Sequence, residues 1–512
     1  MRKRLLIVAV AASMVAVSGT AAAAPRPDLV LGPVQVTGPT PVPNCTAGQG
    51  PASGVVFPGA EVEPWLSVNP KNPRNIIGFV QQDRWSDGGA RALTFSVTHD
   101  GGRHWKEVLF PGVGQCTGGT YQRISDPGVS FAPDGTAYAI ALAASFSADN
   151  TSLQFSGIFA ATSKDGGNTW TKAVALKEDA DPNFFNDKEL ITADPTNSRR
   201  AYAVWDRSNE QGGQPVWFSR TTDGGRTWSP ARIIYDPTPG FTIANQVAVL
   251  PDGSLVDMFF EGPGAAEEPG IASPESAPAA SLDAARARLT QRALQEEDAN
   301  TIRIIRSTDH GRTWSAPITV ATDVPAQIVD PDQGRPLRTA DIVPDIAVDR
   351  HSGRLYVVWQ DASATRSQAA ILLSSSGDGG RHWTAPVRVS RTPDSVAQGN
   401  GQAFTPVVDV SGNGTVGVTY YDFRNNTSAA GVPTDYWIVT CRGSRCQRDT
   451  RSWREQHVGG SFDVTLAPVA RGFFLGDYMG LDHAGPVFVS NFTMTHPIPG
   501  NQQDAFVAGI LP

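Results

Sequence analysis

The sequence predicts an all-β protein, a β-propeller whose blades are four-stranded antiparallel sheets. Two observations lead to this fold class. A short turn pattern occurs five times along the 512 residues, and a pair of apolar segments occurs seven times. Repetition of a short unit along a chain is typical of architectures that stack similar supersecondary units. The repeats therefore outweigh the several domains that length alone would suggest.

The turn pattern is Ser/Thr-x-Asp-x-Gly-x-x-Trp. Its copies begin at Thr98, Ser163, Thr221, Ser307 and Ser376. In each copy the Asp carboxylate can accept backbone N–H groups across a turn, while Gly adopts a positive φ at little cost. Each copy is therefore predicted to join two antiparallel strands, with its Trp packed between neighbouring sheets. A ligand site at each Asp is disfavoured, because the turn already uses the carboxylate.

The second repeated unit is an apolar strand, a Pro/Asp/Gly turn and another apolar strand. It occurs at residues 65–82, 126–142, 189–205, 246–261, 345–359, 407–421 and 478–491. Together with the two strands around the repeated turn, each unit makes a blade of four strands. We expect seven blades, with six as the alternative.

Three repeats depart from this scheme. The seventh has room for only three strands, and residues 29–36 are expected to supply the fourth, which would close the ring and remove an open sheet edge. Repeat six has Cys441 and Cys446 where the turn pattern should be, which predicts a disulfide there. Repeat four carries an insertion at residues 262–300, with a helix-like end at 281–298. The insertion is read as a surface loop or, alternatively, as a lid.

The amino-terminal 24 residues have the features of a secretory signal, with Arg2, Lys3 and Arg4 ahead of a short apolar run. We therefore expect an extracellular protein in which residues 25–512 form one propeller domain. The formal net charge of −8 argues against nucleic acid as a partner. We expect no membrane span, no metal, no cofactor and a monomeric state. For an exported chain, the favoured disulfides are Cys45–Cys116 and Cys441–Cys446.

The spacing of the turn pattern resembles the Asp-box, or BNR repeat, of the sialidase superfamily and related secreted propellers. This resemblance implies an active site on the face opposite the turns, where first strands start and second strands end. Polar residues near the starts of first strands are Glu63, Arg123, Asp126, Asp187, Lys188, Glu189, Asp477 and Tyr478. Those at the ends of second strands include Asp83, Arg84, Trp85, Asp206, Arg207, Glu261, Tyr421, Asp422 and Arg424.

The resemblance further implies an exo-α-sialidase type of glycoside hydrolase acting on terminal carboxylated sugars. In this interpretation Asp83 is the acid/base, and Tyr421 or Tyr478 is the nucleophile with Glu261 as its base. The substrate carboxylate would be held by Arg84, Arg207 and Arg424, since guanidinium groups bind carboxylates bidentately. The remaining predicted substrate-binding residues are Trp85, Arg123, Asp206 and Asp422.

One departure from the superfamily lies in the first blade. Catalytic sialidases carry Arg-Ile-Pro on its inner strand, whereas this chain has Glu63, Pro64 and Trp65 there. A non-catalytic propeller that binds a glycan or a protein through the same rim is the alternative function. For any single charged residue at a blade end, the alternative to a role in the site is a structural ion pair. A Ca²⁺ site among Asp206, Asp422 and Asp477 has less support.

Overall fold

A computed structural model describes residues 29–49, 54–147, 152–208, 213–263, 300–339, 341–364, 368–443, 446–447 and 450–512. The predicted signal segment and the helix-like stretch at 281–298 lie outside these ranges. Within them, regular structure consists of β-strands and three short 3₁₀ helices, Gln115–Thr117, Thr450–Ser452 and Val464–Leu466. The described ranges hold no helix with the length and apolarity needed to cross a bilayer.

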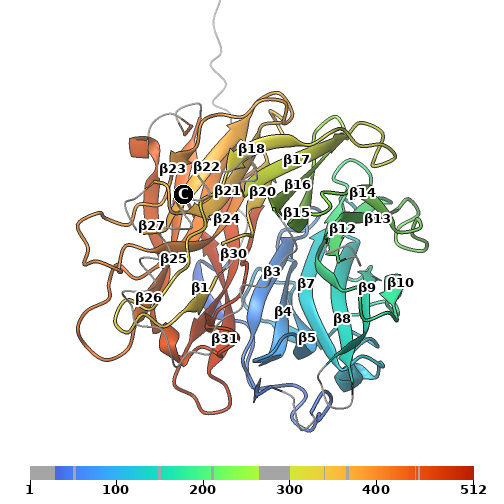
Figure 1. Cartoon of the computed structure of the whole chain (residues 1–512), viewed down its shortest axis with the longest axis horizontal. Coiled ribbons are helices and arrows are strands. Elements are labelled where there is room, and N and C mark those ends of the chain that lie inside the picture. The colour runs from blue at the N-terminus through green and yellow to red at the C-terminus, as the bar shows by residue number, and fades with distance from the viewer. Residues whose placement is uncertain are drawn as a thin grey trace, which may run out of the picture.

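Most strands group into sets of four antiparallel strands, which we call strand sets and number in chain order (Figure 1). Set one consists of β3 (Val62–Val68), β4 (Ile76–Trp85), β5 (Ala90–Thr98) and β6 (Lys106–Leu109). Set two consists of β7 (Arg123–Phe131), β8 (Ala137–Phe146), β9 (Leu153–Ser163) and β10 (Val174–Asp179). Set three consists of β11 (Asn186–Ala193), β12 (Ala201–Arg207), β13 (Val216–Thr221) and β14 (Arg232–Tyr235). A single residue pair, Ala90 with Ile124, joins the first two sets into one sheet.

Four further sets follow. They are β15 (Phe241–Val249), β16 (Leu255–Gly262), β17 (Thr301–Ser307), β18 (Ile318–Thr322); β20 (Asp345–Val348), β21 (Leu355–Asp361), β22 (Ala370–Ser376), β23 (Val387–Arg388); β24 (Ala403–Val410), β25 (Thr415–Asp422), β26 (Pro433–Arg442), β27 (Arg454–Asp463); and β29 (Gly480–Ala484), β30 (Val487–Thr495), β31 (Gln503–Ile510), β1 (Gly32–Gln35). Outside the sets, β2 (Val56–Phe57) pairs with β4, and β19 (Leu337–Arg338) pairs in parallel with β28 (Phe473–Phe474).

The seven predicted strand pairs coincide with the first two strands of the sets. The first strands β3, β7, β11, β15, β20, β24 and β29 each contact the next one, and β29 contacts β3. In Figure 1 the colours accordingly run around the molecule, so that blue β3 and β4 lie beside red β30 and β31. The first strands are largely buried, because neighbouring sets cover them on both sides.

The repeated turns have the predicted hydrogen bonds. Thr98 Oγ1 donates to Asp100 Oδ1 at 2.9 Å, and the same carboxylate oxygen accepts the backbone N–H of His104 at 3.0 Å. The other four copies repeat both bonds. Each turn joins the third and fourth strands of its set. Trp170 stacks on Phe95 of the preceding set, with ring centroids 4.2 Å apart, which confirms the predicted packing between sheets.

Both predicted disulfides are present, Cys45–Cys116 and Cys441–Cys446. The first ties the amino-terminal segment to the connection between β6 and β7, and the second lies between β26 and β27, where the turn pattern is missing. The predicted amino-terminal strand also forms. β1 pairs antiparallel with β31, from Gly32 opposite Gly509 to Gln35 opposite Phe506. Chain segments from both halves of the sequence thus complete the last strand set.

Candidate active site

Five first strands begin with the same backbone distortion. A non-glycine residue there has a positive φ, and the strand register shifts just after it. These residues are Glu63 (54°), Asp126 (52°), Lys188 (46°), Ala244 (64°) and Thr405 (51°). Such angles are uncommon outside glycine, and bulges of this kind change the direction in which side chains point. The distortion therefore marks one common end of the first strands, the end predicted to carry the site.

Polar side chains from strand sets one to three, from β19 and from the connection between β28 and β29 meet at this end. We call them the central cluster, and it consists of Glu63, Arg84, Asp126, Asp187, Lys188, Glu189, Arg338, Asp477 and Tyr478. Electrostatic interactions connect its members, with Glu63 influenced by Asp126, Asp477, Arg84 and Lys188. Asp187 is influenced by Asp126, Lys188 and Arg338. Residues far apart in the sequence therefore form one charged centre.

The side-chain amide of Gln81 holds the buried part of the cluster together. Its Nε2 donates to Glu63 and lies 3.0 Å from Ser125 Oγ. Ser125 in turn donates to Asp126 Oδ1 at 2.7 Å. On its other side, Gln81 Oε1 accepts a hydrogen bond from Arg84 at 2.7 Å. One neutral amide thus fixes two carboxyl groups and a guanidinium group relative to one another.

Arg338 provides the counter-charge for Asp477. Its Nε lies 3.1 Å from Asp477 Oδ1, and a second nitrogen contacts Oδ2, which makes the pair bidentate. The guanidinium groups of Arg338 and Arg84 lie over the ring of Phe474, at 4.5 and 4.8 Å from its centroid. Burial and the proximity of Arg338 lower the pKa of Arg84 to about 10, so Arg84 stays charged at neutral pH.

Glu63 and Asp477 are in contact, but their pKa values are shifted in opposite directions. Burial, followed by the charges of Asp126 and Asp477, raises the pKa of Glu63 well above its usual value. For Asp477, burial acts in the same direction, but Arg338 and a hydrogen bond with Glu63 outweigh it and lower the pKa to about 2. These environments therefore favour the protonated form of Glu63 and the ionised form of Asp477.

Two further carboxyl groups lie at the partly exposed mouth of the cluster. Burial and the nearby Asp126 raise the pKa of Asp187 to about 7. Burial and, to a smaller extent, Asp477 raise the pKa of Asp341 to about 7. Asp477 and Arg338 share this mouth, with 15% and 23% of their side chains exposed. A carboxyl group that titrates near neutral pH at an accessible position suits general acid–base catalysis.

Next to the mouth, Tyr478 and Trp65 line a small cavity among the first strands. Its volume is about 20 Å³, and its polar lining includes Lys188, Asn245, Gln246 and Asp345. The ammonium group of Lys188 lies 3.4 Å from the Tyr478 ring centroid. Burial and the surrounding acidic groups raise the pKa of Tyr478 well above its usual value, so its hydroxyl stays protonated. A cavity of this size holds about one water molecule.

The predicted arginines do not converge on one point. Arg84 belongs to the central cluster, whereas the other three contact carboxylates outside it, Arg123 and Arg207 in the preceding strand set and Arg424 in its own. Arg123 contacts Asp87 at 2.8 Å, Arg207 contacts Asp179 at 2.8 and 2.6 Å, and Arg424 contacts Asp422 at 2.7 Å and Glu455 at 2.6 Å. Each also lies over an aromatic ring, Trp85, Phe184 and Trp437 respectively. Their predicted role in substrate binding remains a prediction.

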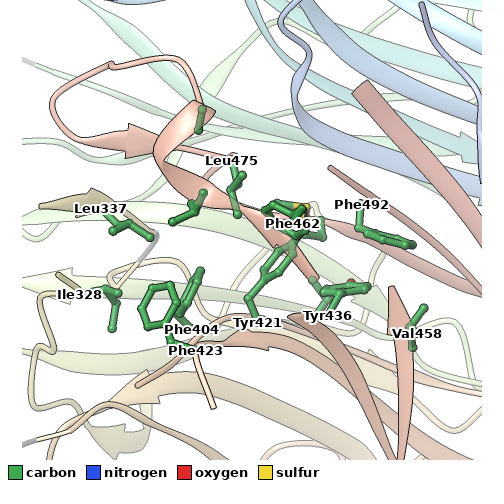
Figure 2. Packing of buried hydrophobic residues seen from close by; sticks show 14 of the residues in the cluster. Ile328, Leu337, Phe404, Tyr421, Phe423, Tyr436, Val458, Phe462, Leu475 and Phe492 are labelled. Atoms are coloured by element: carbon green, nitrogen blue, oxygen red, sulfur yellow. Dashed lines mark hydrogen bonds between the residues drawn. The ribbon is translucent and has the colours of Figure 1, made fainter. Parts of the chain in front are cut away.

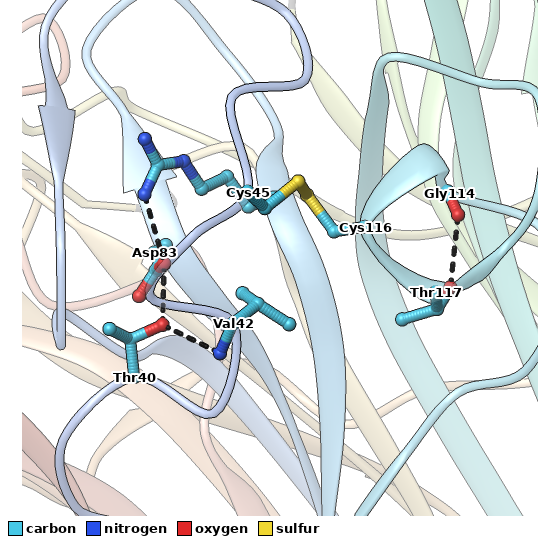
Figure 3. Close-up of a disulfide and its surroundings, with 8 residues drawn as sticks. Thr40, Val42, Cys45, Asp83, Gly114, Cys116 and Thr117 are labelled. Carbon is cyan, nitrogen blue, oxygen red and sulfur yellow. Dashed lines mark hydrogen bonds and ion pairs between the residues drawn. A yellow bond between two sulfur atoms is a disulfide. The ribbon is translucent and has the colours of Figure 1, made fainter.

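Asp83, predicted as the acid/base, holds the amino-terminal segment (Figure 3). It accepts hydrogen bonds from Thr40 Oγ1 at 2.7 Å and from the backbone of Gly59 at 2.9 Å, and Arg91 lies 3.5 Å away. The Cys45–Cys116 disulfide lies close by in the same view. The side chain of Asp83 is fully buried. Its contacts are those of a structural anchor, and its catalytic role remains a prediction.

The remaining catalytic candidates, Tyr421 and Glu261, lie apart from each other. Tyr421 is fully buried in an aromatic cluster with Phe404 and Tyr436, shown in Figure 2, and its hydroxyl donates to the Thr493 carbonyl at 2.9 Å. Glu261 accepts a hydrogen bond from Tyr235 at 2.6 Å. Similar Tyr–Glu bonds link Tyr121 to Glu178 and Tyr420 to Glu455. Recurrence in several sets is typical of a structural link rather than of a nucleophile and its base.

The three aspartates considered for Ca²⁺ have separate surroundings. Asp206 contacts Thr242 and Asn245, Asp422 contacts Arg424, and Asp477 contacts Arg338. Among the described residues, side chains with ligand-like spacing are instead Asp409, Asp482 and His483. His483 Nδ1 lies 2.7 Å from Asp409, and Asp482 accepts the backbone N–H of Val68 at 2.8 Å. These contacts connect neighbouring strand sets.

Comparisons with known proteins give structural likenesses only. No family model matches the chain, and no curated protein matches it. The chain is similar to the Hadza microbial sialidase Hz136 at 14% identity, covering 95% of each chain with a TM-score of 0.44. It is similar to the α-L-arabinofuranosidase Arb93A of Fusarium graminearum at 14% identity, covering 94% of this chain and 97% of that chain, with a TM-score of 0.43. For the intramolecular trans-sialidase of Ruminococcus gnavus the identity is 12%, the coverage 91% and 97%, and the TM-score 0.41.

Proposed function

We propose that the protein is a secreted seven-bladed β-propeller with glycoside hydrolase activity at the central cluster. In this proposal each strand set is one blade, residues 25–512 form one domain and the signal segment is removed. The cyclic contacts of the first strands and the pairing of β1 with β31 support the blade number. Two disulfides support folding in an oxidising compartment.

The observation that carries the proposed activity is a pair of accessible carboxyl groups with different protonation at one mouth. Asp477 is held as a carboxylate by Arg338, and Asp187 has a pKa of about 7. Environments that separate the pKa values of two carboxyl groups supply an acid and a base for hydrolysis of a glycosidic bond.

We assign the steps to these two residues. Protonated Asp187 donates its proton to the leaving oxygen as the glycosidic bond breaks, while the Asp477 carboxylate stabilises the positive charge that develops on the sugar ring. Water then adds to the anomeric carbon and returns a proton to Asp187. Arg338 and the protonated Glu63 keep Asp477 ionised. The neutral Tyr478 borders the site. The exo-α-sialidase type predicted from the sequence is one candidate within this class.

The first prediction concerns these two carboxyl groups. A panel of methylumbelliferyl glycosides that includes a sialoside, a uronide, neutral hexosides and pentosides should contain at least one substrate. Asp187→Asn and Asp477→Asn should each lower kcat/KM for it by at least about 100-fold, since each removes the acid–base or charge-stabilising group. Asp394→Asn is the matched control, because its side chain is 82% exposed and lies on the surface.

Melting temperatures of all variants identify any loss of folding. Unchanged kcat/KM in both Asn variants, or no turnover on the whole panel, would contradict the proposal. Absence of turnover combined with glycan-array binding would support the second candidate function, a glycan-binding propeller. The first blade has Glu63, Pro64 and Trp65 where catalytic sialidases carry Arg-Ile-Pro, and this departure favours that candidate.

A further inference from the structure

We infer that the central site accepts sugars without a carboxylate group and discriminates against carboxylated ones. This inference rests on the proposed function for its location and extends it to the substrate class. It follows from the partners of the positive charges near the site and from the side chains that line the mouth.

The first step concerns the arginines outside the cluster. Recognition of a carboxylated sugar needs guanidinium groups that can bind it bidentately. Arg207 instead forms two hydrogen bonds with Asp179, at 2.8 and 2.6 Å. Arg424 is held by Asp422 and by both oxygens of Glu455, at 2.6 and 2.8 Å. A substrate carboxylate would have to displace these internal partners.

The second step concerns the cations within the cluster. Arg338 is bidentate on Asp477. Arg84 donates to Gln81, and only 2% of its surface is exposed, so a ligand at the mouth cannot reach it. The ammonium group of Lys188 lies over the Tyr478 ring. None of the three offers the open guanidinium fork that a carboxylate needs.

The third step concerns the lining of the mouth. Its partly exposed carboxyl groups are Asp187, Asp341 and Asp477, and the cations that act on them among the described residues are Arg338, Lys188 and the buried Arg84. A substrate carboxylate would therefore find these cations already partnered, and it would add a further negative charge beside three carboxyl groups. Sugar hydroxyl groups, in contrast, can donate hydrogen bonds to these groups. An ionised carboxylate accepts hydrogen bonds and donates none. The partly exposed Trp65 offers an apolar surface beside them.

The test uses matched pairs that differ in one charge. Methyl glucoside is compared with methyl glucuronide, and N-acetylneuraminic acid with its methyl ester, by titration calorimetry. The corresponding methylumbelliferyl glycosides are compared by kcat/KM. The uncharged member of at least one pair should bind or react at least about 10-fold better.

Asp341→Asn provides a variant outside the proposed acid–base pair. At pH 8, above the pKa of about 7 of Asp341, removing this negative charge should reduce the discrimination against the carboxylated member about 5-fold. Asp394→Asn should leave the discrimination unchanged, since it lies on the surface. An unchanged ratio in Asp341→Asn would contradict the inference, provided that the variant melts at the wild-type temperature.

The outcomes separate this inference from the proposed activity. Binding of the uncharged sugars without any turnover would reject hydrolysis and support the inference. Better binding or turnover of the carboxylated member would overturn the inference and leave hydrolysis intact. Absence of both binding and turnover for every compound would overturn both.

Discussion

The hydroxyl of Tyr421 donates to the Thr493 carbonyl, and its ring packs against Phe404 and Tyr436. From the sequence alone this residue is a candidate nucleophile, since it precedes Asp422 at the end of a second strand. The structure gives it packing partners that no local pattern indicates. The hydroxyl of a buried tyrosine often has a structural role only, which is to form one hydrogen bond with a buried partner.

Tyr421→Phe should separate the structural role from a catalytic one. Loss of the hydroxyl leaves the Thr493 carbonyl without this buried donor, so the free energy of unfolding should fall by about 1–2 kcal/mol. Denaturant unfolding measures this change. The kcat on any glycoside that the wild type hydrolyses should stay the same, and a drop of more than about 10-fold in a folded variant would restore Tyr421 as nucleophile.

At the scale of elements, the amino-terminal strand β1 is followed by a buried carboxyl pair. Thr37 Oγ1 lies 3.0 Å from Glu61 and 3.1 Å from Asp504. Burial and the charge of Asp504 raise the pKa of Glu61 well above 4.5. The folded protein therefore retains a proton on Glu61 that the unfolded chain releases, and the stability associated with it is lost as pH rises.

Glu61→Gln should remove this pH dependence. The amide can accept from Gln82 and donate to Asp504, as protonated Glu61 does, but it has no proton to release. The wild type should lose stability from pH 5 towards pH 8, because the folded pKa of Glu61 lies above the unfolded one. The variant should lose less, as measured by unfolding midpoints at both pH values. Equal slopes in the two proteins would refute this.

The elements themselves could be predicted because each repeat carries its own local signal. Pro, Asp or Gly in the turns, between two apolar segments, marks all seven strand pairs, and the spare segment at residues 29–36 indicates the missing strand. The site could be predicted only in part. Glu63, Asp187 and Asp477 lie at strand starts that the repeats define, whereas Arg338 and Phe474 come from β19 and β28, two-residue strands without a pattern. Gln81 resembles any other polar residue of a second strand.

At the scale of the whole molecule, the two disulfides close loops of very different length. Cys45 and Cys116 are 71 residues apart, and Cys441 and Cys446 are 5 apart. Because the entropy lost by the unfolded chain grows with loop length, removal should cost about 4 kcal/mol for the first pair and about 2 kcal/mol for the second.

Paired Cys→Ser variants test this order. Denaturant unfolding of the Cys45/Cys116 variant should show the larger loss. The two variants also serve as controls for each other, since each removes two sulfur atoms. A larger loss in the Cys441/Cys446 variant would show that the replaced turn, rather than chain entropy, dominates.

The pairing of β1 with β31 has a consequence for how the chain reaches its native state. Gly32–Gln35 of β1 are synthesised long before Phe506–Gly509 of β31, to which they are hydrogen-bonded. Contacts this distant in sequence slow folding, because a long loop must close before they form. β1 therefore cannot take its native place in the sheet before β31 has been synthesised.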